Sequence, residues 1–161
     1  MPRIRPESLE SYSGTGYPPP HDAGMGRYSA RDLGDAAGLT QFGVVLQTLE
    51  PGAASSIRHW HEAEDEFVWL LSGALTVEED HESYPLAPGE GAGWKAGVPV
   101  HHRLVNHTDA PATYLVVGTR AWQDCCHYAD IDLVLRRDAG SDSDRFTRRD
   151  GTPLPRKERD T

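Results

Sequence analysis

The feature of this sequence that most limits its fold is a succession of short apolar runs separated by turn residues. Between residues 39 and 136 such runs recur about every 8–12 residues, with Gly, Pro or acidic residues between them. Alternation within the runs, as in 42–49, is typical of β-strands with two different faces. The other runs that we expect to be strands are 55–61, 66–71, 74–77, 83–86, 99–106, 114–119 and 131–135. The pattern predicts an all-β chain folded as an antiparallel β-barrel or jelly roll, and not a parallel α/β sheet.

The two ends of the chain lack this alternation. Residues 1–38 are rich in Pro, Gly, Ser and Tyr, so we expect an irregular N-terminal arm, with a turn or two of helix within 29–37. Beyond Arg136 the sequence becomes polar and charged, which is typical of a tail that buries little surface. The expected organisation is a single domain, with the arm at 1–38, the β-barrel at 39–136 and the tail at 137–161.

The net charge and the lack of long apolar runs indicate which kinds of molecule the chain can bind. The 161 residues carry a formal net charge of −9, which disfavours nucleic acid because phosphate backbones bind basic faces. No run approaches the roughly 20 apolar residues that a membrane span requires, and the N-terminus lacks the apolar core of a secretory signal. We therefore expect a cytoplasmic protein that binds a small molecule, with no nucleic-acid partner and no membrane.

Residues able to bind a metal ion gather in the stretch 51–73. His59 and His61 are two residues apart, so they leave the same face of a strand, and Glu66 stands at the head of the next run. Two imidazoles and a carboxylate that converge on one point are part of a metal-ligand set. Glu64 and Asp65 are alternatives to Glu66, unless they lie in a solvated turn.

A third imidazole is expected from the stretch 89–106. His101 and His102 are adjacent there, so only one of them can face inward from a strand. We select His102, and His101 is the alternative.

Both stretches resemble the paired motifs of the cupin superfamily, a fold of small antiparallel β-barrels. The first motif is a glycine, His-x-His, a glutamate and a glycine, here Gly52, His59, His61, Glu66 and Gly73. The second runs from a glycine through Pro-x-Gly to a histidine with an asparagine four positions later, here Gly89, Lys95-Ala96-Gly97, His102 and Asn106. The distance to Asn106 supports His102. The sequence departs from the pattern by one extra residue before His59, by Lys95 in place of proline and by a longer gap before His102.

The resemblance implies that His59, His61, Glu66 and His102 hold one divalent metal ion, for which Zn, Fe, Mn or Ni would be suitable. Tetrahedral Zn would fill all four positions and could be structural. Octahedral Fe, Mn or Ni would leave two positions open to water, oxygen or a chelating substrate. Trp94 and Tyr114 could line the pocket, although an aromatic residue in such a place is more often plain core.

The whole chain is similar to the small stand-alone bacterial cupins, which implies a metal-centred pocket for a small polar or anionic molecule. Because cupins include isomerases, dioxygenases and non-catalytic binders, the fold leaves the reaction open. We expect a metal-dependent enzyme, isomerase-like or dioxygenase-like, whose catalytic residues beyond the ligands the sequence does not identify. The alternative is a non-catalytic module that binds or senses a small ligand.

Two further expectations concern assembly and the cysteines. A homodimer is expected because the arm and tail are long relative to one barrel, and edge strands need cover. Cys125 and Cys126 are adjacent, and neighbouring residues seldom reach disulfide geometry, so both are expected to be reduced thiols.

Overall fold

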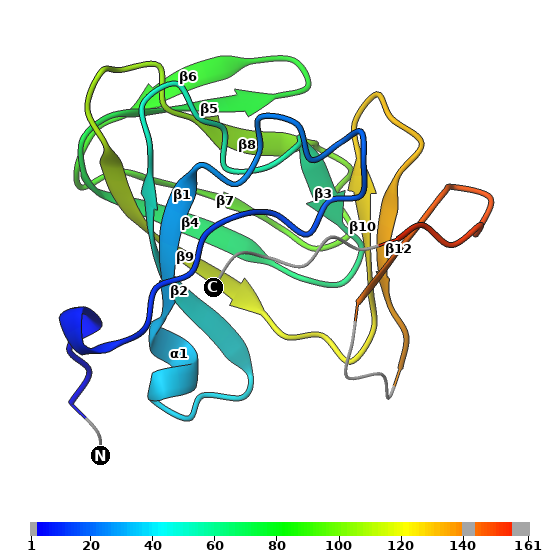
Figure 1. Cartoon of the computed structure of the whole chain (residues 1–161), viewed down its shortest axis with the longest axis horizontal. Helices are drawn as coiled ribbons and strands as arrows, with labels where there is room; N and C mark the ends of the chain where they lie inside the picture. The colour runs from blue at the N-terminus through cyan, green and yellow to red at the C-terminus, as the bar shows by residue number, and fades with distance from the viewer. Residues whose placement is uncertain (1–2, 140–143, 156–161) are drawn as a thin grey trace.

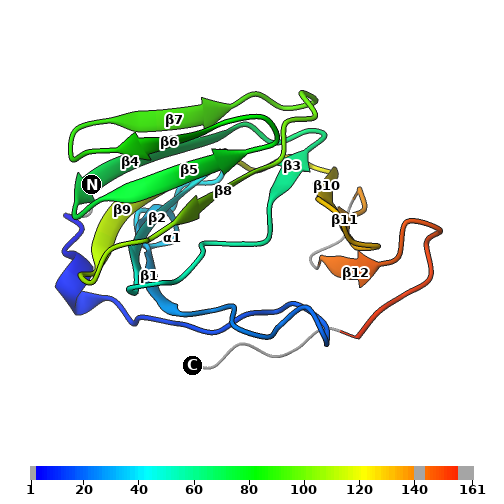
Figure 2. The same cartoon turned by 90° about the horizontal axis from the view of Figure 1, so that it is seen from above.

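The computed structural model describes residues 3–139 and 144–155, and almost all of its regular structure is β-strand. Every strand pairing is antiparallel, and the strands form two sheets that enclose a common core (Figures 1 and 2). The predicted all-β, antiparallel jelly-roll fold is confirmed.

The smaller sheet has five strands. Its order is β1 (Tyr28–Asp32), β2 (Phe42–Leu49), β9 (Ala112–Thr119), β4 (Glu66–Ser72) and β7 (Gly91–Trp94). The central strands β2, β9 and β4 coincide with three of the runs that we predicted to be strands. On β4 the residues at even positions from Glu66 to Leu70 face inward, whereas Phe67, Trp69 and Leu71 face outward and are exposed.

The larger sheet has seven strands. Its order is β12 (Arg145–Thr147), β11 (Val134–Arg137), β10 (Asp124–Tyr128), β3 (His59–His61), β8 (His102–Val105), β5 (Leu75–Glu79) and β6 (Ser83–Leu86). Two short helices complete the described elements, the 3-10 helix η1 (Pro6–Ser8) and α1 (Leu33–Ala36). None of the helices in the described parts of the chain is long and apolar enough to cross a membrane.

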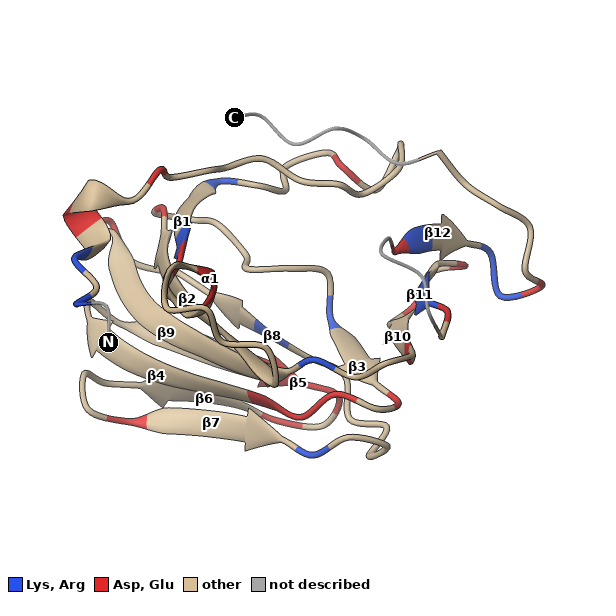
Figure 3. Ribbon diagram, turned by 90° about the horizontal axis from the view of Figure 1, so that it is seen from below, with Lys and Arg blue, Asp and Glu red and all other residues tan. Residues whose placement is uncertain are grey.

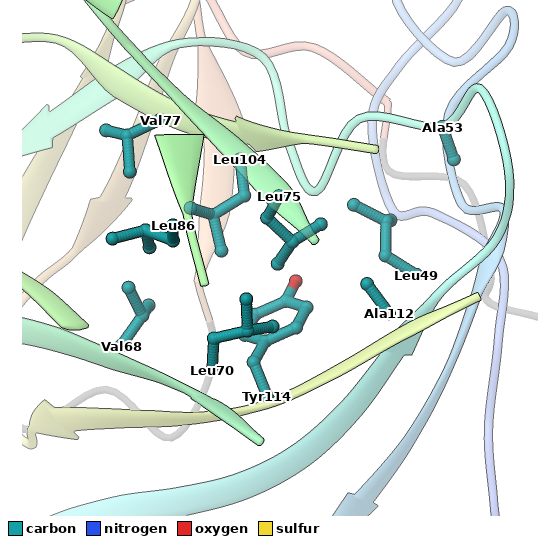
Figure 4. Packing of buried hydrophobic residues seen from close by; sticks show 10 residues of the cluster. All are labelled: Leu49, Ala53, Val68, Leu70, Leu75, Val77, Leu86, Leu104, Ala112 and Tyr114. Carbon is teal, nitrogen blue, oxygen red and sulfur yellow. The ribbon is translucent and has the colours of Figure 1, made fainter. Parts of the chain in front are cut away.

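The main core lies between the two sheets. Its buried side chains come from the inner faces of both sheets and include Leu49, Val68, Leu70, Leu75, Val77, Leu86, Leu104 and Tyr114 (Figure 4). A second cluster, formed by Cys126, Tyr128, Leu133 and Phe146, lies beneath the strands β10 to β12. Burial of these apolar groups is the main force that holds the sheets together.

The ends of the chain contribute strands that the sequence did not suggest. Of the expected helix within 29–37, only Leu33–Ala36 is helical, because the preceding residues pair along their whole length with β2. β12 lies beyond residue 137 and pairs with β11. The sheets thus continue into the segments that we assigned to the arm and the tail.

The sheet order brings distant parts of the sequence together at the short strand β3. His59 pairs with His102 of β8 on one side and with Tyr128 of β10 on the other. Glu66 is the first residue of β4 in the opposite sheet. The two predicted motifs therefore meet between the sheets.

Candidate metal centre

Three imidazole nitrogens converge on one oxygen of Glu66. The distance from Glu66 Oε2 is 3.3 Å to His102 Nε2, 3.5 Å to His59 Nε2 and 3.9 Å to His61 Nε2. Metal–ligand bonds of about 2.1 Å at tetrahedral angles place neighbouring ligand atoms about 3.4 Å apart. His59, Glu66 and His102 therefore have nearly the spacing that a divalent ion requires, with their ligand atoms all within 4.8 Å of one another, whereas His61 lies farther out and would have to move inward to join them. We call these four residues the candidate metal centre.

Backbone carbonyls orient two of the rings. The Nδ1 of His59 lies 3.0 Å from the carbonyl oxygen of Ile57, and the Nδ1 of His102 lies 3.2 Å from that of Val100. A carbonyl oxygen can only accept a hydrogen bond, so each Nδ1 carries a proton, and each Nε2 faces the centre, where it donates to Glu66 or, in the neutral ring, offers a lone pair to a metal ion. Such support of the distal ring nitrogen is typical of metal-binding histidines.

A carboxylate orients the third ring. His61 Nδ1 lies 2.6 Å from Asp124 Oδ2, and Asp124 Oδ1 accepts a hydrogen bond from the backbone of Ala63. Asp124 stands at the start of β10, next to β3 in the sheet but 63 residues away in sequence. Asp124 could not be predicted from the sequence, since no local pattern indicates this contact.

Burial and hydrogen bonding set the charges of the centre. Burial lowers the pKa of His59 and favours the neutral ring that binds metals. Burial opposes ionisation of Glu66, but hydrogen bonds with His102 and His59 outweigh it, and the pKa of Glu66 lies well below its usual range. Burial likewise lowers the pKa of His61, but hydrogen bonds with Asp124 and Cys126 and the charges of Cys126 and Glu66 together outweigh it and raise the pKa to about 11. An ion bound at His61 Nε2 would therefore have to displace a proton.

The alternative residues have other partners. His101 points away from the centre, with its Nδ1 2.9 Å from Asp80 Oδ2, whereas His102 is 2% exposed and faces Glu66. Glu64 pairs with Arg137, and Asp65 accepts a hydrogen bond from the backbone of residue 96. The geometry thus favours His102 and Glu66, the residues that we selected.

Two more side chains contact the rings of the centre. Trp94 stacks on His102 with ring centroids 3.8 Å apart and planes inclined by 5°, which fixes the plane of that imidazole. The Sγ of Cys126 lies within 4.8 Å of ligand nitrogens of His59 and His61. Both Cys125 and Cys126 are free and buried, as expected.

Space for a ligand exists on both sides of the centre. An inner cavity of about 100 Å³ is lined by His59, Glu66 and His102 and also by Gln47, Trp94 and Tyr114. An outer recess of about 270 Å³ is lined by His61 and Glu66 together with Glu64, Arg120 and Arg137. Arg137 pairs with Glu64 and Asp144, and Arg120 with Asp35, so the arginines of the outer recess are already matched by carboxylates.

A single jelly-roll barrel with three histidines and a glutamate gathered between its sheets is the arrangement of a single-barrel protein with a candidate metal centre. The chain belongs to the cupin superfamily. The model of the Cupin domain matches residues 45–118, which contain all four residues of the candidate metal centre.

Comparison with solved structures places the chain among close relatives. It is similar to a sugar phosphate isomerase of the cupin superfamily from Silicibacter pomeroyi, with 47% identity, a TM-score of 0.89 and coverage of 95% of this chain and 96% of the other. A proposed sugar phosphate isomerase from Acidithiobacillus ferrooxidans is 31% identical, with a TM-score of 0.70 and 81% of each chain covered.

More distant similarity concerns the fold alone. A polyketide cyclase from Streptomyces resistomycificus is 20% identical, with a TM-score of 0.58 and coverage of 74% of this chain and 79% of the other. The comparison with curated proteins finds no match.

Proposed function

We propose that this chain is a metal-dependent enzyme that holds one divalent ion, Zn, Fe, Mn or Ni, at the candidate metal centre and acts on a small polar or anionic molecule. The observation that supports this most directly is the convergence of three Nε2 atoms on one oxygen of Glu66 at 3.3–3.9 Å, with every Nδ1 held by a second group. Metal-binding histidines typically have such support. A bound divalent ion would polarise a carbonyl oxygen or acidify a water molecule.

Isomerase-like chemistry is the reaction class that we favour within this proposal. Two similar structures carry the name sugar phosphate isomerase, at 47% and 31% identity. Isomerisation of a hydroxy-carbonyl compound needs a polarised carbonyl but no change in the oxidation state of the ion. Oxygen-dependent cleavage requires a redox-active ion such as Fe or Mn, so the identity of the ion separates the two classes.

One observation favours the alternative of a non-catalytic binding module. Among the described residues that line the inner cavity, the ionisable groups outside the centre are Tyr114 and Arg103. Burial raises the pKa of Tyr114, and Arg103 pairs with Glu78, so neither side chain offers a general base near neutral pH.

Elemental analysis tests metal binding. Protein prepared without a histidine tag should contain about one equivalent of ion per chain, and a His59→Ala, His61→Ala double variant should contain none. The matched control is a double variant at His81 and His107, two histidines outside the centre, which should retain the ion. Equal metal contents in the two double variants would contradict the proposed centre, as would a wild type that stays metal-free after reconstitution.

Two assays then separate enzyme from binding module. Metal-loaded protein is incubated with aldose and ketose phosphates in D₂O, and exchange of the proton next to the carbonyl, on C2 of the aldose or C1 of the ketose, is followed by NMR, while oxygen uptake is recorded in parallel. Exchange that the His59→Ala, His61→Ala variant lacks supports isomerase-like chemistry, and oxygen uptake supports dioxygenase-like chemistry. Ligand binding with neither reaction would support the binding module.

A further inference from the structure

The inner cavity extends from the candidate metal centre into the interior of the barrel. Its volume of about 100 Å³ leaves room for about three water molecules at the liquid's roughly 30 Å³ each. The residues Glu66, Val68 and Leu70 face inward along β4, and Leu70 pairs with Tyr114 of β9. Tyr114 therefore stands two inward positions further along the sheet than Glu66, yet both line the same cavity.

The hydroxyl of Tyr114 has no internal partner. The residue is 1% exposed, and within the described ranges its Oη forms no hydrogen bond. Figure 4 shows this hydroxyl pointing away from β9 into the middle of the core. Burying a hydroxyl without a partner destabilises a fold, so an unpartnered hydroxyl on a residue that lines a cavity beside the candidate metal centre calls for an explanation.

A second polar side chain lines the cavity from the neighbouring strand. Gln47 of β2 is the direct cross-strand partner of Tyr114, so the two side chains leave the same inner face of the sheet. On both strands the flanking inward positions are apolar, namely Val45 and Leu49 on β2 and Ala112 and Val116 on β9. The pair formed by Gln47 and Tyr114 thus places an amide and a hydroxyl in the core between two apolar cross-strand pairs.

We propose that Tyr114 is a substrate-binding residue whose hydroxyl donates a hydrogen bond to an oxygen atom of a small hydroxy-carbonyl compound bound in the inner cavity. Gln47 lines the same cavity and is a second donor and acceptor for that oxygen. The inference rests on the proposed function for the other end of the ligand, which would lie at the candidate metal centre.

The electrostatics favour a neutral oxygen at this depth. Burial raises the pKa of Tyr114, and the charge of Glu66 raises it further, so the hydroxyl remains protonated and able to donate. The same charge disfavours an anionic group beside it. A hydroxyl or carbonyl end therefore enters the barrel, and any charged end stays towards the outer recess.

Two probes and two variants test the proposal. Dihydroxyacetone and hydroxyacetone differ by one terminal hydroxyl, and their binding can be followed by saturation-transfer NMR on both metal-free and Co²⁺-loaded protein. Tyr114→Phe should weaken dihydroxyacetone binding about three- to tenfold, as expected for one lost hydrogen bond, and change hydroxyacetone binding less than about twofold. Tyr84→Phe is the control, because the Tyr84 hydroxyl donates to Glu79 and its ring packs against the same core outside the inner cavity.

Thermal unfolding distinguishes a binding role of the Tyr114 hydroxyl from a structural one, because only a structural role predicts a lower melting temperature for Tyr114→Phe. Tyr114→Phe removes an unpartnered buried hydroxyl without changing the shape of the ring, so its melting temperature should equal or exceed that of the wild type. A melting temperature several degrees below the wild type would show that the hydroxyl supports the fold and would overturn the proposal.

The outcomes separate this inference from the proposed function. Tyr114-dependent probe binding without Co²⁺ binding would support the assignment of Tyr114 and overturn the metal centre. Co²⁺ binding with equal probe affinities in wild type and Tyr114→Phe would support the metal centre and overturn the assignment. A wild type that binds neither probe overturns it as well.

Discussion

Among single residues, Asp124 shows how one carboxylate orients the ring of a candidate metal ligand, His61. Its two oxygens are both used, one by His61 Nδ1 at 2.6 Å and the other by the backbone of Ala63 at 2.9 Å. The side chain is 6% exposed, so water cannot easily replace either contact. Asp124 therefore fixes both the ring and the turn that follows β3.

Replacement of Asp124 should weaken metal binding without removing a ligand. Asp124→Asn keeps the shape of the side chain but loses the charge that holds the His61 ring, and we expect metal affinity to fall about 10- to 100-fold. Competition with a fluorescent chelator measures this change. Asp132→Asn, at an aspartate that pairs with Arg148 instead, is the control and should stay within about twofold of the wild type. Equal affinities for the two variants would argue against an orienting role.

His101, just before β8, and His102, the first residue of β8, lead to opposite predictions. His102→Ala removes an inward ring 3.3 Å from Glu66 and should abolish stoichiometric metal binding. His101→Ala removes a ring that contacts Asp80 and should leave the metal content unchanged. Elemental analysis of both variants decides between them, and metal loss in His101→Ala alone would reverse our assignment of the third histidine.

Among the structural elements, the turn between β5 and β6 is linked through Asp80 to the segments that precede β3 and β8. Asp80 lies between β5 and β6, pairs with Arg58 just before β3 and accepts hydrogen bonds from the backbone and ring of His101 just before β8. Burial would raise the pKa of Asp80, but the hydrogen bonds from His101 and the charge of Arg58 lower it overall.

The lowered pKa predicts a pH-dependent contribution to stability. A carboxyl group whose pKa is lower in the folded state stabilises the protein fully above its unfolded pKa, and this stabilisation is lost as the pH falls through the folded pKa. Asp80→Asn should therefore lower the free energy of unfolding by about 1 kcal/mol at pH 6–8, a value limited by partial exposure to solvent. The difference from the wild type should shrink below about pH 4.

Urea denaturation at a series of pH values measures this effect. Asp109→Asn, at an exposed aspartate, is the control and should differ little from the wild type at every pH. A wild-type advantage over Asp80→Asn that persists unchanged at pH 3 would show that the carboxylate charge is not its source.

Elements with one buried face could be predicted from the sequence, and others could not. β2 alternates between its two faces, β4 and β9 are near-continuous apolar runs and β6 is a short run between turns, and the structure has strands at all four. β10 was missed because Cys125 and Cys126 are both buried although they point to opposite faces, which removes the alternation. β1 was missed because it is defined by pairing with β2, a tertiary contact.

The same distinction applies to the candidate metal centre. His59, His61, Glu66 and His102 stand in two short motifs, so local spacing suffices to select them. The supporting contact from Asp124 and the polar row at Gln47 and Tyr114 depend on which strands become neighbours. No local pattern contains that information.

At the scale of the whole molecule, the outer face of the five-stranded sheet is apolar. It carries Phe42, Val44 and Leu46 of β2, Phe67, Trp69 and Leu71 of β4, and Leu115 and Val117 of β9. Among the described residues, four of the six exposed large apolar side chains lie here, with exposed fractions of 39–45%. The ribbons of β9, β4 and β7 carry hardly any charged residue along their middle (Figure 3). Exposed patches of this kind mark association sites.

We propose that a second copy of this chain covers the outer face in a homodimer. Five strands about 4.8 Å apart, of four to eight residues each, span about 500 Å², which is more than half of the roughly 800 Å² per partner of a standard interface. The face holds almost no charge that would select a different partner. A two-fold axis, moreover, requires only that the same apolar surface meet itself.

Light scattering tests the homodimer at micromolar concentration. The wild type should elute with twice the mass of the 17.7 kDa chain. A Phe67→Glu, Trp69→Glu double variant should be monomeric, because four like charges cannot be buried together. Trp122→Glu, at a 73% exposed tryptophan in the loop between β9 and β10, is the control and should remain dimeric. Circular dichroism verifies that the monomeric variant is folded. A monomeric wild type would exclude the homodimer, and a dimer that survives the double substitution would place the interface on another face.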